Sequence, residues 1–473
     1  MKKPWFRPIL FDTLRGDSFP LETNESGIVR MYHCGPTLYS RPTIGNWRSF
    51  LFSDLLRRTL EWGGWKVFQA MNITDVGHMR EGEDESVKFD PIEEKATKKG
   101  VSPWEIVSLY EKDFFNDMDS LYMKRPTYIS KASDHIEDMV SMIEKLIEKG
   151  YAYKSNGNVY FSVKSFEKYG NLSKNSIDDL DAGHRVDVNL EKKDPTDFAL
   201  WKTDSKHIMK WNTSLGSDGF PGWHIECSAM VNDLFKDKLD IHSGGEDLIF
   251  PHHECEIAQS EAFSGKKLAG HWMHCRFLLV DGGKMGKSLG NAYTPSDIYK
   301  KGFTGAELRY SLMRGHYRQP LNFSFDLLKD SRATLNRIKN FLEEVKDFSA
   351  DEDTDSSFVE KYRKSFVEYL KKDLDVPQAV AVLMDLIKDS RKKGIKKISG
   401  SLQKFLSEVD DVLGILPKEN HLDDMKIEEM ITSRNEARKN KDWEKADQIR
   451  KELLSLGVQI KDSSSGTTWH SVK

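Results

Sequence analysis

The sequence lacks the features that would place the protein in a membrane or outside the cell. No apolar run approaches the ~20 residues that a transmembrane helix needs, and the segment from Met1 to Trp5 has no apolar core like that of a signal peptide. Only four cysteines occur in 473 residues, too few for a disulfide framework. We therefore expect a cytoplasmic protein with no membrane segment, whose cysteines are metal ligands or free thiols.

A strong net charge and internal repeats at solenoid periods are also absent. The formal net charge is -4, and 38% of the residues are hydrophobic and 31% charged. This charge is not a signature of nucleic-acid binding, but a local basic face can still bind a polyanion. A chain of 473 residues is too long for one compact core, so roughly two to four domains are expected.

The N-terminal part has the pattern of an α/β fold. Residues Ile28 to Cys34 have the apolar and aromatic content of a strand, which Gly35-Pro36 ends. A helix is expected from about Asn46, stopped by Gly63-Gly64, and Lys66 to Ile73 resembles a second strand. Strand, turn, helix and strand in this order predict a parallel sheet.

A different pattern begins at about Pro126 and continues to Trp211. Apolar positions from Ile136 to Ile147 predict an amphipathic helix, and Asn156-Gly157 between two short apolar runs predicts a hairpin. This segment looks like an insertion that interrupts the parallel sheet. The sheet is expected to resume near Asp240 and again at Phe277 to Val280.

The C-terminal part is expected to be helical. Long amphipathic stretches run from Phe303 to about Leu416, broken by the acidic segment 351–357. Two short charged helices are expected near Ile427–Asn440 and Asp442–Leu456, followed by Gly457 and a short tail. The charged stretch 79–99 predicts an exposed loop and then a helix, and its sequence assigns it no role.

The stretch from Ser217 to Ser288 concentrates residues that bind metals. It holds six of the fourteen histidines and three of the four cysteines. His252 and Glu256 lie four apart in a predicted helix with Pro251 in its first turn, so their side chains share one face. Two cysteines, one ending the first strand and one following a glycine-rich loop, could join them. Two thiolates, an imidazole and a carboxylate suit zinc better than magnesium or calcium.

Spacing alone leaves the set of ligands open. Cys255 lies three residues after His252 and is chemically a better zinc ligand than Glu256. His253, His274 and Cys275 are also nearby in the sequence. Each of these residues alone is compatible with an ordinary helix or core, but the whole cluster favours a metal site.

Two glycine-containing turns could hold phosphate. Pro42 to Asn46 precedes a helix whose free N–H groups and dipole attract anions, although a plain turn with Asn46 as N-cap is the alternative. The lysine loop, Lys284-Met285-Gly286-Lys287-Ser288, is not a Walker loop. Its two ammonium groups could neutralise charge on pyrophosphate, and a solvated basic turn is the alternative.

Several motifs, in order and nearly from end to end, resemble those of the cysteinyl-tRNA synthetase family of class I aminoacyl-tRNA synthetases. The motifs are Met31–Thr37, Gly222–Met230, Gly244–Gln259, Lys284–Asn291, Gly315–Arg318 with Leu321–Ser324, and Gly466–Trp469. The resemblance implies a Rossmann-like catalytic domain that ligates L-cysteine to tRNA(Cys) through a cysteinyl-adenylate. It also implies one Zn²⁺ per chain, with ATP and Mg²⁺ as substrate.

The resemblance implies roles for individual residues as well. The zinc ligands would be Cys34, Cys227, His252 and Glu256. The catalytic residues would be Thr43 and Asn46, at the family's HIGH signature, with Lys284 and Lys287 in its KMSKS signature. The residues at ATP would be Gly45, Asp247 and Lys287, and those around the bound cysteine Trp223, His224 and His242. Binding the substrate as a thiolate on zinc would distinguish cysteine from serine, so no editing domain is expected.

The same resemblance, with the shifts in composition, divides the chain. The expected parts are two halves of the catalytic domain at 1–125 and 212–302, the insertion at 126–211, a helical bundle at 303–416 that contacts the tRNA stem, and an anticodon-binding domain at 417–473. Trp469 could stack on a base. Six basic residues lie on or beside the last two helices: Arg434, Arg438, Lys439, Lys441, Arg450 and Lys451. We expect a monomer.

The sequence departs from the family pattern at three positions. Thr43 and Asn46 replace the two histidines of the HIGH signature, and Gly286 replaces the usual serine of the lysine loop. Tryptophanyl-tRNA synthetases of the same class can carry Thr-Ile-Gly-Asn at the first site. Two rival functions remain: a ligase joining cysteine to an amino sugar, which should lack the terminal region, and a non-catalytic zinc-bearing RNA-binding paralogue.

Overall fold

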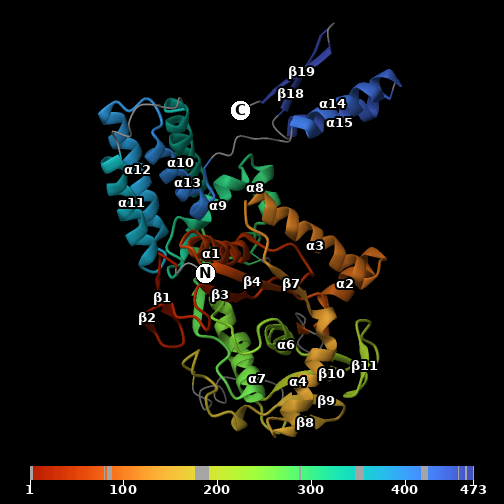
Figure 1. Cartoon of the computed structure of the whole chain (residues 1–473). Helices are drawn as coiled ribbons and strands as arrows, with labels where there is room; N and C mark the ends of the chain where they lie inside the picture. Colours follow the sequence, from red (N-terminus) through yellow and green to blue (C-terminus); the bar gives the residue numbers. More distant parts are fainter. Residues whose placement is uncertain are drawn as a thin grey trace. The chain divides into compact units, whose positions relative to one another are not determined.

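The protein, a computed structural model of the whole chain, forms two compact units, Met1–Ile415 and Leu416–Lys473, which are described separately. The structure describes residues 4–78, 80–81, 88–175, 191–286, 289–346, 356–416, 424–440, 442–455, 458–463 and 466–471. Figure 1 labels their helices and strands. Within these residues, no helix has both the length and the apolar character that crossing a bilayer requires.

A five-stranded parallel sheet lies at the centre of the first unit. Its strands, in spatial order, are β14 His271–Cys275, β13 Ile241–Gly245, β3 Ile28–His33, β4 Lys66–Ile73 and β7 Tyr128–Lys131. Neighbouring strands in this order are all parallel. Parallel strands need a crossover, and helix α1 supplies it between β3 and β4. The predicted α/β fold with a parallel sheet is confirmed.

Helix α1, Ile44–Trp62, begins two residues before the predicted start, and Thr43 rather than Asn46 is its N-cap. The Thr43 main-chain N–H and hydroxyl both donate to Asn46 Oδ1, at 2.9 Å each. Asn46 therefore closes the first turn from inside the helix. Gly63 ends the helix as predicted.

Buried arginines fix α1 against the helices that follow the sheet. Asp54 Oδ2 accepts hydrogen bonds from Arg58 at 2.9 Å and from Arg309 of α9, Gly305–Met313, at 2.7 Å. Arg48 is also buried and donates to four main-chain carbonyls. Buried charges are costly unless they are paired or hydrogen-bonded, so these contacts set the position of α1 more than they add stability.

The predicted insertion contains a five-stranded antiparallel sheet and a helix. In spatial order its strands are β11 Trp211–Thr213, β12 Gly216–Pro221, β10 Phe198–Thr203, β9 Asn158–Phe161 and β8 Ala152–Ser155. Asn156 and Gly157 adopt positive φ at the β8–β9 turn, which confirms the predicted hairpin. Helix α4, Ile136–Glu148, buries its predicted apolar face.

Two strands, β7 and β12, lie on the opposite side of the predicted limits of the insertion, residues 126 and 211, from the sheet to which they belong. β7 falls inside those limits but pairs with β4 in the parallel sheet. β12 falls beyond them but pairs with β10 in the insertion sheet. Both strands are short, and neither carries an apolar run that would have marked its sheet in the sequence.

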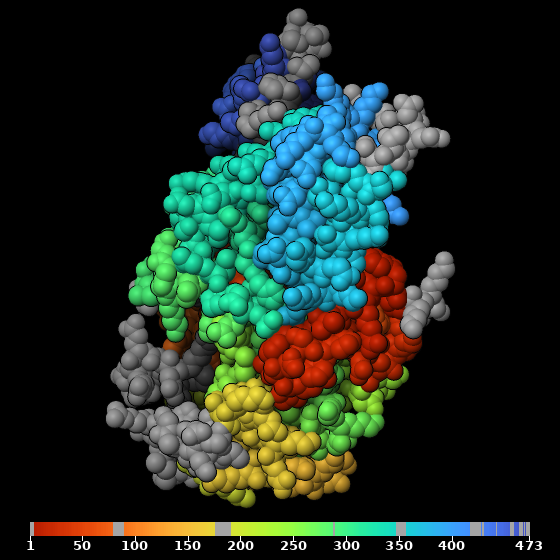
Figure 2. Space-filling view, turned by 90° about the vertical axis from the view of Figure 1, so that its left-hand side faces the viewer, coloured from red at the N-terminus to blue at the C-terminus, as the bar shows by residue number. Residues whose placement is uncertain are grey.

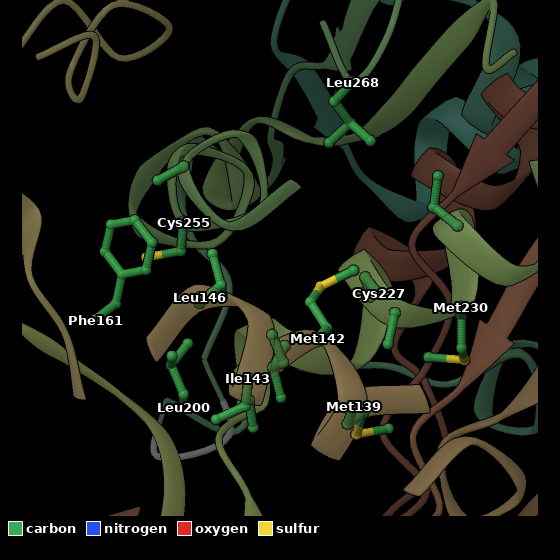
Figure 3. Close-up of a cluster of buried hydrophobic side chains, with 14 of the residues drawn as sticks. Met139, Met142, Ile143, Leu146, Phe161, Leu200, Cys227, Met230, Cys255 and Leu268 are labelled. Atoms are coloured by element: carbon green, nitrogen blue, oxygen red, sulfur yellow. The ribbon is translucent and has the colours of Figure 1, made fainter. Parts of the chain in front are cut away.

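One hydrophobic cluster joins the insertion to the parallel-sheet part. Figure 3 shows members from α4, from the insertion strands and from helices α6, Trp223–Phe235, and α7, Glu254–Ser264. The members that the figure labels are Met139, Met142, Ile143, Leu146, Phe161, Leu200, Cys227, Met230, Cys255 and Leu268. Because the cluster is continuous, we expect the insertion and the catalytic part to unfold together.

Replacing Ile143 with valine should test this shared core. Ile143 is fully buried in the cluster, and removal of one buried methylene costs ~0.5–1.5 kcal/mol of the free energy of unfolding. In urea, the fluorescence and circular-dichroism transitions should both shift to lower concentration by the same amount. Separate transitions, with only one of them shifted, would show that the insertion unfolds independently.

A separate three-stranded sheet corrects one prediction. The sequence predicts that Phe277 to Val280 continues the parallel sheet, but β15, Leu278–Val280, pairs instead with β16, Gly283–Lys284, and β17, Leu321–Phe323. The strand of the parallel sheet that the sequence did not predict is β14. Its histidines are buried, and polar residues at buried positions conceal the apolar pattern on which a strand prediction depends.

Helices cover the parallel sheet and continue into the predicted helical region. Besides α6, α7 and α9, the helices near the sheet are α2 Pro91–Lys99, α3 Pro103–Ser120 and α8 Pro295–Lys300. The helical region contains α10 Phe325–Glu344, α11 Ser356–Lys371, α12 Val376–Lys393 and α13 Gly400–Leu413. The predicted helices after Phe303 are confirmed. The acidic segment 351–357 lies mostly outside the described residues.

The N-terminal strands contact the helical region. β1, Ile9–Asp12, pairs antiparallel with β2, Asp17–Pro20, and Ile9 also bridges to Lys372 after α11. Figure 2 shows the N-terminal residues in red beside the blue surface of α11 and α12. In the charged stretch 79–99, two short strands, β5 Arg80–Glu81 and β6 Lys88–Phe89, pair with each other ahead of α2.

The second unit contains two helices and a hairpin. The helices, α14 Asp424–Lys439 and α15 Trp443–Ser455, are close to their predicted bounds. The predicted short tail is instead an antiparallel hairpin of β18, Val458–Ser463, and β19, Gly466–Ser471. The core of the unit contains Ile427, Ile431, Leu453, Val458 and Ile460, with Trp469 packed against it.

Candidate active site

Three segments of the first unit bring the four predicted metal ligands together. Cys34 directly follows β3, at the carboxyl end of the parallel sheet. Cys227 lies in the second turn of α6. His252 precedes α7, and Glu256 lies in its first turn. The carboxyl ends of parallel strands are the usual position of ligand sites in α/β folds.

The ligand atoms of these four residues lie within 4.8 Å of one another, and all four residues are buried. Cys34 Sγ is 4.0 Å from Cys227 Sγ and 3.5 Å from Glu256 Oε1. His252 Nε2 is 3.1 Å from Glu256 Oε1. Two sulfur donors, one nitrogen and one oxygen around one point match the ligand types and number of a tetrahedral zinc site.

The backbone reaches this geometry by a route that the sequence did not predict. Pro251 is not in the first turn of α7, because the helix begins at Glu254. Residues Ile249–His253 form an irregular turn in which Phe250 has extended φ and ψ of -137° and 134°. His252 and Glu256 nevertheless face the same point.

The two remaining cysteines lie away from this cluster. Cys255 points into the hydrophobic cluster (Figure 3), where its Sγ is 3.4 Å from the Tyr169 hydroxyl. Cys275 Sγ faces the main-chain oxygen of Arg48 at 3.9 Å. Neither belongs to any group of potential metal ligands among the described residues. The geometry therefore favours Glu256 over Cys255.

Two further histidines lie close to these ligands: His253, which the sequence left open as a ligand, and His242, which the resemblance placed around bound cysteine. His242 and His253 form a second group with Cys34 and Glu256, also within 4.8 Å. His242 Nε2 is 2.9 Å from Glu256 Oε2, and His253 Nε2 is 3.3 Å from Cys34 Sγ. His253 Nδ1 in turn lies 2.8 Å from His274 Nε2. Such contacts orient the ligand side chains.

The side chains of the cluster shift one another's pKa values. The Cys227 pKa is lowered, chiefly because Cys34 donates a hydrogen bond to it. Burial favours a neutral Glu256, but His242 and His252 outweigh it and lower the pKa of Glu256 to about 2. Burial also opposes charge on His252, yet bonds to Cys227 and Glu256 raise its pKa to about 10. A carboxylate with a low pKa beside a thiol with a lowered pKa suits the binding of a cation, because metal ligands must be deprotonated.

The two predicted phosphate-binding turns are in contact. A Cβ on Gly45, in the first turn of α1, would lie 2.5 Å from Met285 Cε of the lysine loop. Thr43 and Asn46 are accessible at the start of the same helix. A Cβ on Gly245 would lie 2.3 Å from Asp247 Oδ1 and 3.8 Å from Ser49 Oγ of α1. The absence of side chains on both glycines thus leaves room for close packing beside α1.

Asn291 holds the lysine loop. Its Oδ1 accepts the N–H of Gly286 at 2.9 Å, and its Nδ2 donates to the carbonyl of Lys284 at 3.1 Å. The Lys284 side chain is exposed at the end of β16. Lys287 and Ser288 lie outside the described residues, so the structure gives no position for the second lysine.

Comparison with known proteins decides the family. A model described as the class I (C) tRNA synthetase catalytic domain matches residues 20–333, and one described as the cysteinyl-tRNA ligase anticodon binding domain matches residues 424–469. A cysteine–tRNA ligase of Lachnospira eligens is 39% identical over 481 residues, covering 97% of this chain and 99% of the relative. The chain belongs to the cysteinyl-tRNA synthetase family. A cysteine–tRNA ligase of Caldicellulosiruptor saccharolyticus is 38% identical over 477 residues, 98% of this chain and 100% of the relative.

A solved structure confirms the fold of a class I synthetase. The structure of Mycobacterium tuberculosis methionyl-tRNA synthetase with methionyl-adenylate has a TM-score of 0.57 and 12% identity, covering 82% of this chain and 88% of that chain. At this identity the likeness concerns the fold alone. It agrees with the Rossmann-like parallel sheet expected for a cysteinyl-tRNA synthetase.

The residues expected around bound cysteine lie beside the four predicted metal ligands. The Trp223 ring is 4.7 Å from the His252 ring and is partly exposed at the start of α6. His224 Nδ1 is 2.8 Å from His252 Nδ1. His242 is fully buried and stacks on Trp272 at 4.4 Å, and its Nδ1 has no hydrogen-bond partner among the described residues. These three side chains are thus close enough to the cluster to contact a ligand there.

The sequence did not indicate one further group beside the cluster. Glu226, the residue before Cys227, is fully buried. Its Oε2 accepts the Thr74 hydroxyl at 2.7 Å, and its Oε1 forms an ion pair with His78. Thr74 and His78 follow β4. The spacing between these segments is too long for any local pattern to associate them.

Two expected tRNA contacts in the second unit have structural partners. Trp469 packs against the small core of the unit. Arg434 is buried and donates to Asp462 Oδ1 and Oδ2 at 3.0 and 2.8 Å, and Arg438 lies 2.9 Å from the same carboxylate. Arg434 therefore holds the hairpin on α14 and is not accessible to RNA. The Asp462 pKa is well below its usual range because of these arginines.

Loss of the Asn291 side chain should release the lysine loop. In the Asn291→Ala variant we expect the KM for ATP to rise about tenfold in ATP–pyrophosphate exchange, because a loop that must be ordered on binding weakens the interaction. The KM for cysteine should change little. As a control, Asn212→Ala removes a similar bond, to the N–H of Asp218 at 3.1 Å, in the insertion sheet. An unchanged KM for ATP in the Asn291 variant would contradict the expected role.

Proposed function

We propose that the protein joins L-cysteine to tRNA(Cys) with ATP, through a cysteinyl-adenylate. The observation that carries the proposal is the convergence of Cys34, Cys227, His252 and Glu256 at one buried point in a chain of this family. Such a cluster recognises a substrate by its sulfur, and cysteine is the amino acid whose thiol fits it. The contact between the Thr43–Asn46 turn and the lysine loop supports a nucleotide site on the same edge of the sheet.

The four side chains of the cluster would hold one zinc ion. When bound, zinc supplies a bond to the thiolate of the substrate, which the hydroxyl of serine cannot match. Ordinary contacts distinguish such similar substrates only ~10–200-fold, so this bond provides selectivity. Trp223, His224 and His242 would enclose the side chain of the bound cysteine. The contact with His242 would hold the Glu256 carboxylate in its orientation.

The nucleotide would bind beside the N-terminus of α1. Thr43 and Asn46 would hydrogen-bond the phosphates, and Gly45 would allow close approach. Lys284 and Lys287 would stabilise the leaving pyrophosphate, and Asp247 would bind the ribose. Mg²⁺ would accompany ATP, bound mainly through phosphate and water oxygens. In the first step the cysteine carboxylate attacks the α-phosphate, and the protein contributes orientation and charge stabilisation.

The remaining parts would bind the tRNA. The helical bundle, residues 303–416, would contact the stem, and the C-terminal domain, residues 417–473, would contact the anticodon. Lys439, Arg450 and Lys451 are exposed on α14 and α15 and could bind phosphate. Trp469 would contact a base only through the part of its ring that the core leaves accessible. The monomeric state stays a prediction, which light scattering of the purified protein would test.

One pair of assays distinguishes this function from its rivals. Cysteine-dependent exchange of pyrophosphate into ATP tests for adenylate formation, and addition of tRNA(Cys) tests for esterification. Exchange without charging of tRNA would support the amino-sugar ligase, and absence of both would support a non-catalytic paralogue. The matched C-terminal anticodon-binding region argues against the first rival.

A further inference from the structure

A buried cluster of charged side chains lies outside the cysteine site, between α2 and the insertion. His207 Nε2 is 3.0 Å from Asp90 Oδ2 and 3.5 Å from Glu93 Oε1. The side chains of Asp90 and His207 are each 1% exposed, and that of Glu93 is 16% exposed. Charged groups are rarely buried to this extent without a specific arrangement.

Local structure fixes each member of this cluster. Asp90 is the N-cap of α2, and its Oδ1 accepts the N–H of Ile92 at 2.7 Å. Glu93 Oε1 accepts the main-chain N–H of Ile208 at 2.6 Å and that of Met209 at 3.1 Å. Two residues of α2 thus hold the loop of the insertion that carries His207.

The His207 ring is itself held in one orientation. Its Nδ1 donates to the carbonyl of Met209 at 2.9 Å, and the ring stacks on Phe220 of β12 at 4.2 Å. Its Nε2 therefore faces the two carboxylates. The charged stretch 79–99, to which the sequence assigns no role, is in this way joined to the insertion.

The segment Thr74–His78 lies between this cluster and the cysteine site. A Cβ on Gly77 would lie 1.6 Å from Asp90 Oδ2 and 3.1 Å from His207 Nε2, so the main chain at Gly77 packs directly on the pair. On the other side, Thr74 and His78 both bind the buried carboxylate of Glu226. Glu226 immediately precedes the proposed ligand Cys227 in α6.

We propose that Asp90, Glu93 and His207 are positioning residues for the cysteine site. They hold the main chain at Gly77 in position, and this places His78 and Thr74 against Glu226. The contact with Glu226 in turn fixes the start of α6. This part of α6 carries Trp223, His224 and Cys227. None of the three residues touches the substrate. This inference rests on the proposed function, because its effect appears as a change in cysteine binding.

The charge on His207 gives the cluster a dependence on pH. Burial opposes this charge, but the hydrogen bond to Asp90 and the carboxylate of Glu93 outweigh it and raise the His207 pKa. Phe220, Gly77 and the Met209 carbonyl, which also lie against the ring, are neutral. The ion pair is complete below the ordinary pKa of histidine. The ion pair is lost as the pH rises through the raised pKa of His207, because His207 then loses the Nε2 proton that it donates in the hydrogen bond to Asp90.

Two substitutions and a matched control test the proposal. In Asp90→Ala and His207→Ala, we expect the KM for cysteine in pyrophosphate exchange to rise about tenfold, since small displacements of positioning groups have effects of this size or larger. The KM for ATP should stay at the wild-type value, and so should the content of metal. His207→Gln can still donate to Asp90 and should recover most of the loss. His135→Gln alters a partly exposed histidine, 2.8 Å from Asp138, and should have no effect.

Two further measurements separate positioning from stability alone. Amide hydrogen exchange at residues 74–78 should accelerate in Asp90→Ala and not in His135→Gln. In the wild type, the KM for cysteine should rise at alkaline pH. This rise should be smaller in His207→Gln, because the glutamine side chain does not titrate.

Clear results would overturn the inference. Wild-type kinetics in folded Asp90→Ala, or equal increases in the KM for cysteine and for ATP, would each exclude a role specific to the cysteine site. A second equivalent of metal, present in the wild type and lost in Asp90→Ala, would show that the cluster is a cation site instead. Absence of cysteine-dependent exchange in the wild type is a different outcome, because it removes the proposed function itself.

Discussion

Replacing Cys227 with alanine is expected to lower cysteine-dependent ATP–pyrophosphate exchange by about two to three orders of magnitude, the range seen when a group that stabilises the reacting state is removed. Cys227 Sγ lies 4.0 Å from Cys34 Sγ in the buried cluster. Three ligands would remain, and metal affinity falls when a first ligand is lost. The purified variant should therefore contain less than one zinc per chain by elemental analysis.

The same variant should also show a much weaker preference for cysteine over serine. With the metal gone, discrimination returns to the ~10–200-fold that ordinary contacts provide. The measurement is the ratio of kcat/KM for the two amino acids in the exchange assay. Activity and preference that both survive in a metal-free variant would show that the cluster has only a structural role.

Cys255→Ala is the matched control for this experiment. It removes a buried thiol from the same region, but Cys255 packs in the hydrophobic cluster beside Tyr169 and outside the ligand group. We expect a modest loss of stability, full zinc content and nearly unchanged exchange. Zinc loss in this variant equal to that in Cys227→Ala would contradict the choice of Glu256 as the fourth ligand.

Deletion of residues 416–473 is expected to lower the charging of tRNA by ~100-fold or more while exchange stays near the wild-type rate. Two linked binding surfaces raise overall affinity by large factors, and removal of one forfeits that gain. The second unit has its own core. Residues 1–415 contain the four predicted metal ligands and both predicted phosphate-binding turns, so we expect adenylate formation without the deleted residues.

The control for the deletion is the stability of the shortened chain. Its thermal unfolding should stay cooperative, because the clusters of buried residues in the first unit are internal to that unit. The rise in KM for tRNA should account for most of the loss. Equal losses of exchange and charging would mean that the second unit is needed for folding rather than for binding tRNA.

Local sequence patterns predicted the elements whose residues obey a simple period. Strand β4 has its predicted bounds, the Asn156-Gly157 hairpin is present, and α4 buries the expected face. Strand β14 was missed, since its histidines are buried among other polar site residues. The terminal hairpin was missed because β19, rich in threonine and serine, lacks an apolar alternation. In both cases tertiary contacts outweigh local propensity.

The candidate site shows a similar division. Spacing placed His252 and Glu256 on one face, and the relation holds although α7 begins after both Pro251 and His252. Spacing could not exclude Cys255, because residues three and four apart share a helix face. The direction of the Cys255 side chain excludes it, and that direction depends on the core around Tyr169. Likewise, only the fold pairs Arg434 with Asp462 and removes it from the RNA-binding surface.

By itself the sequence determined the family, the parallel-sheet architecture and the residue types that could bind a metal, since motifs and periodicity are local properties of the chain. Only the tertiary structure decided which of those residues meet. It brought Cys34 and Cys227 to the pair of His252 and Glu256, and it joined Asp90 with His207 across 117 residues. Contacts of this kind follow from how strands and helices pack, and no spacing in the sequence encodes them.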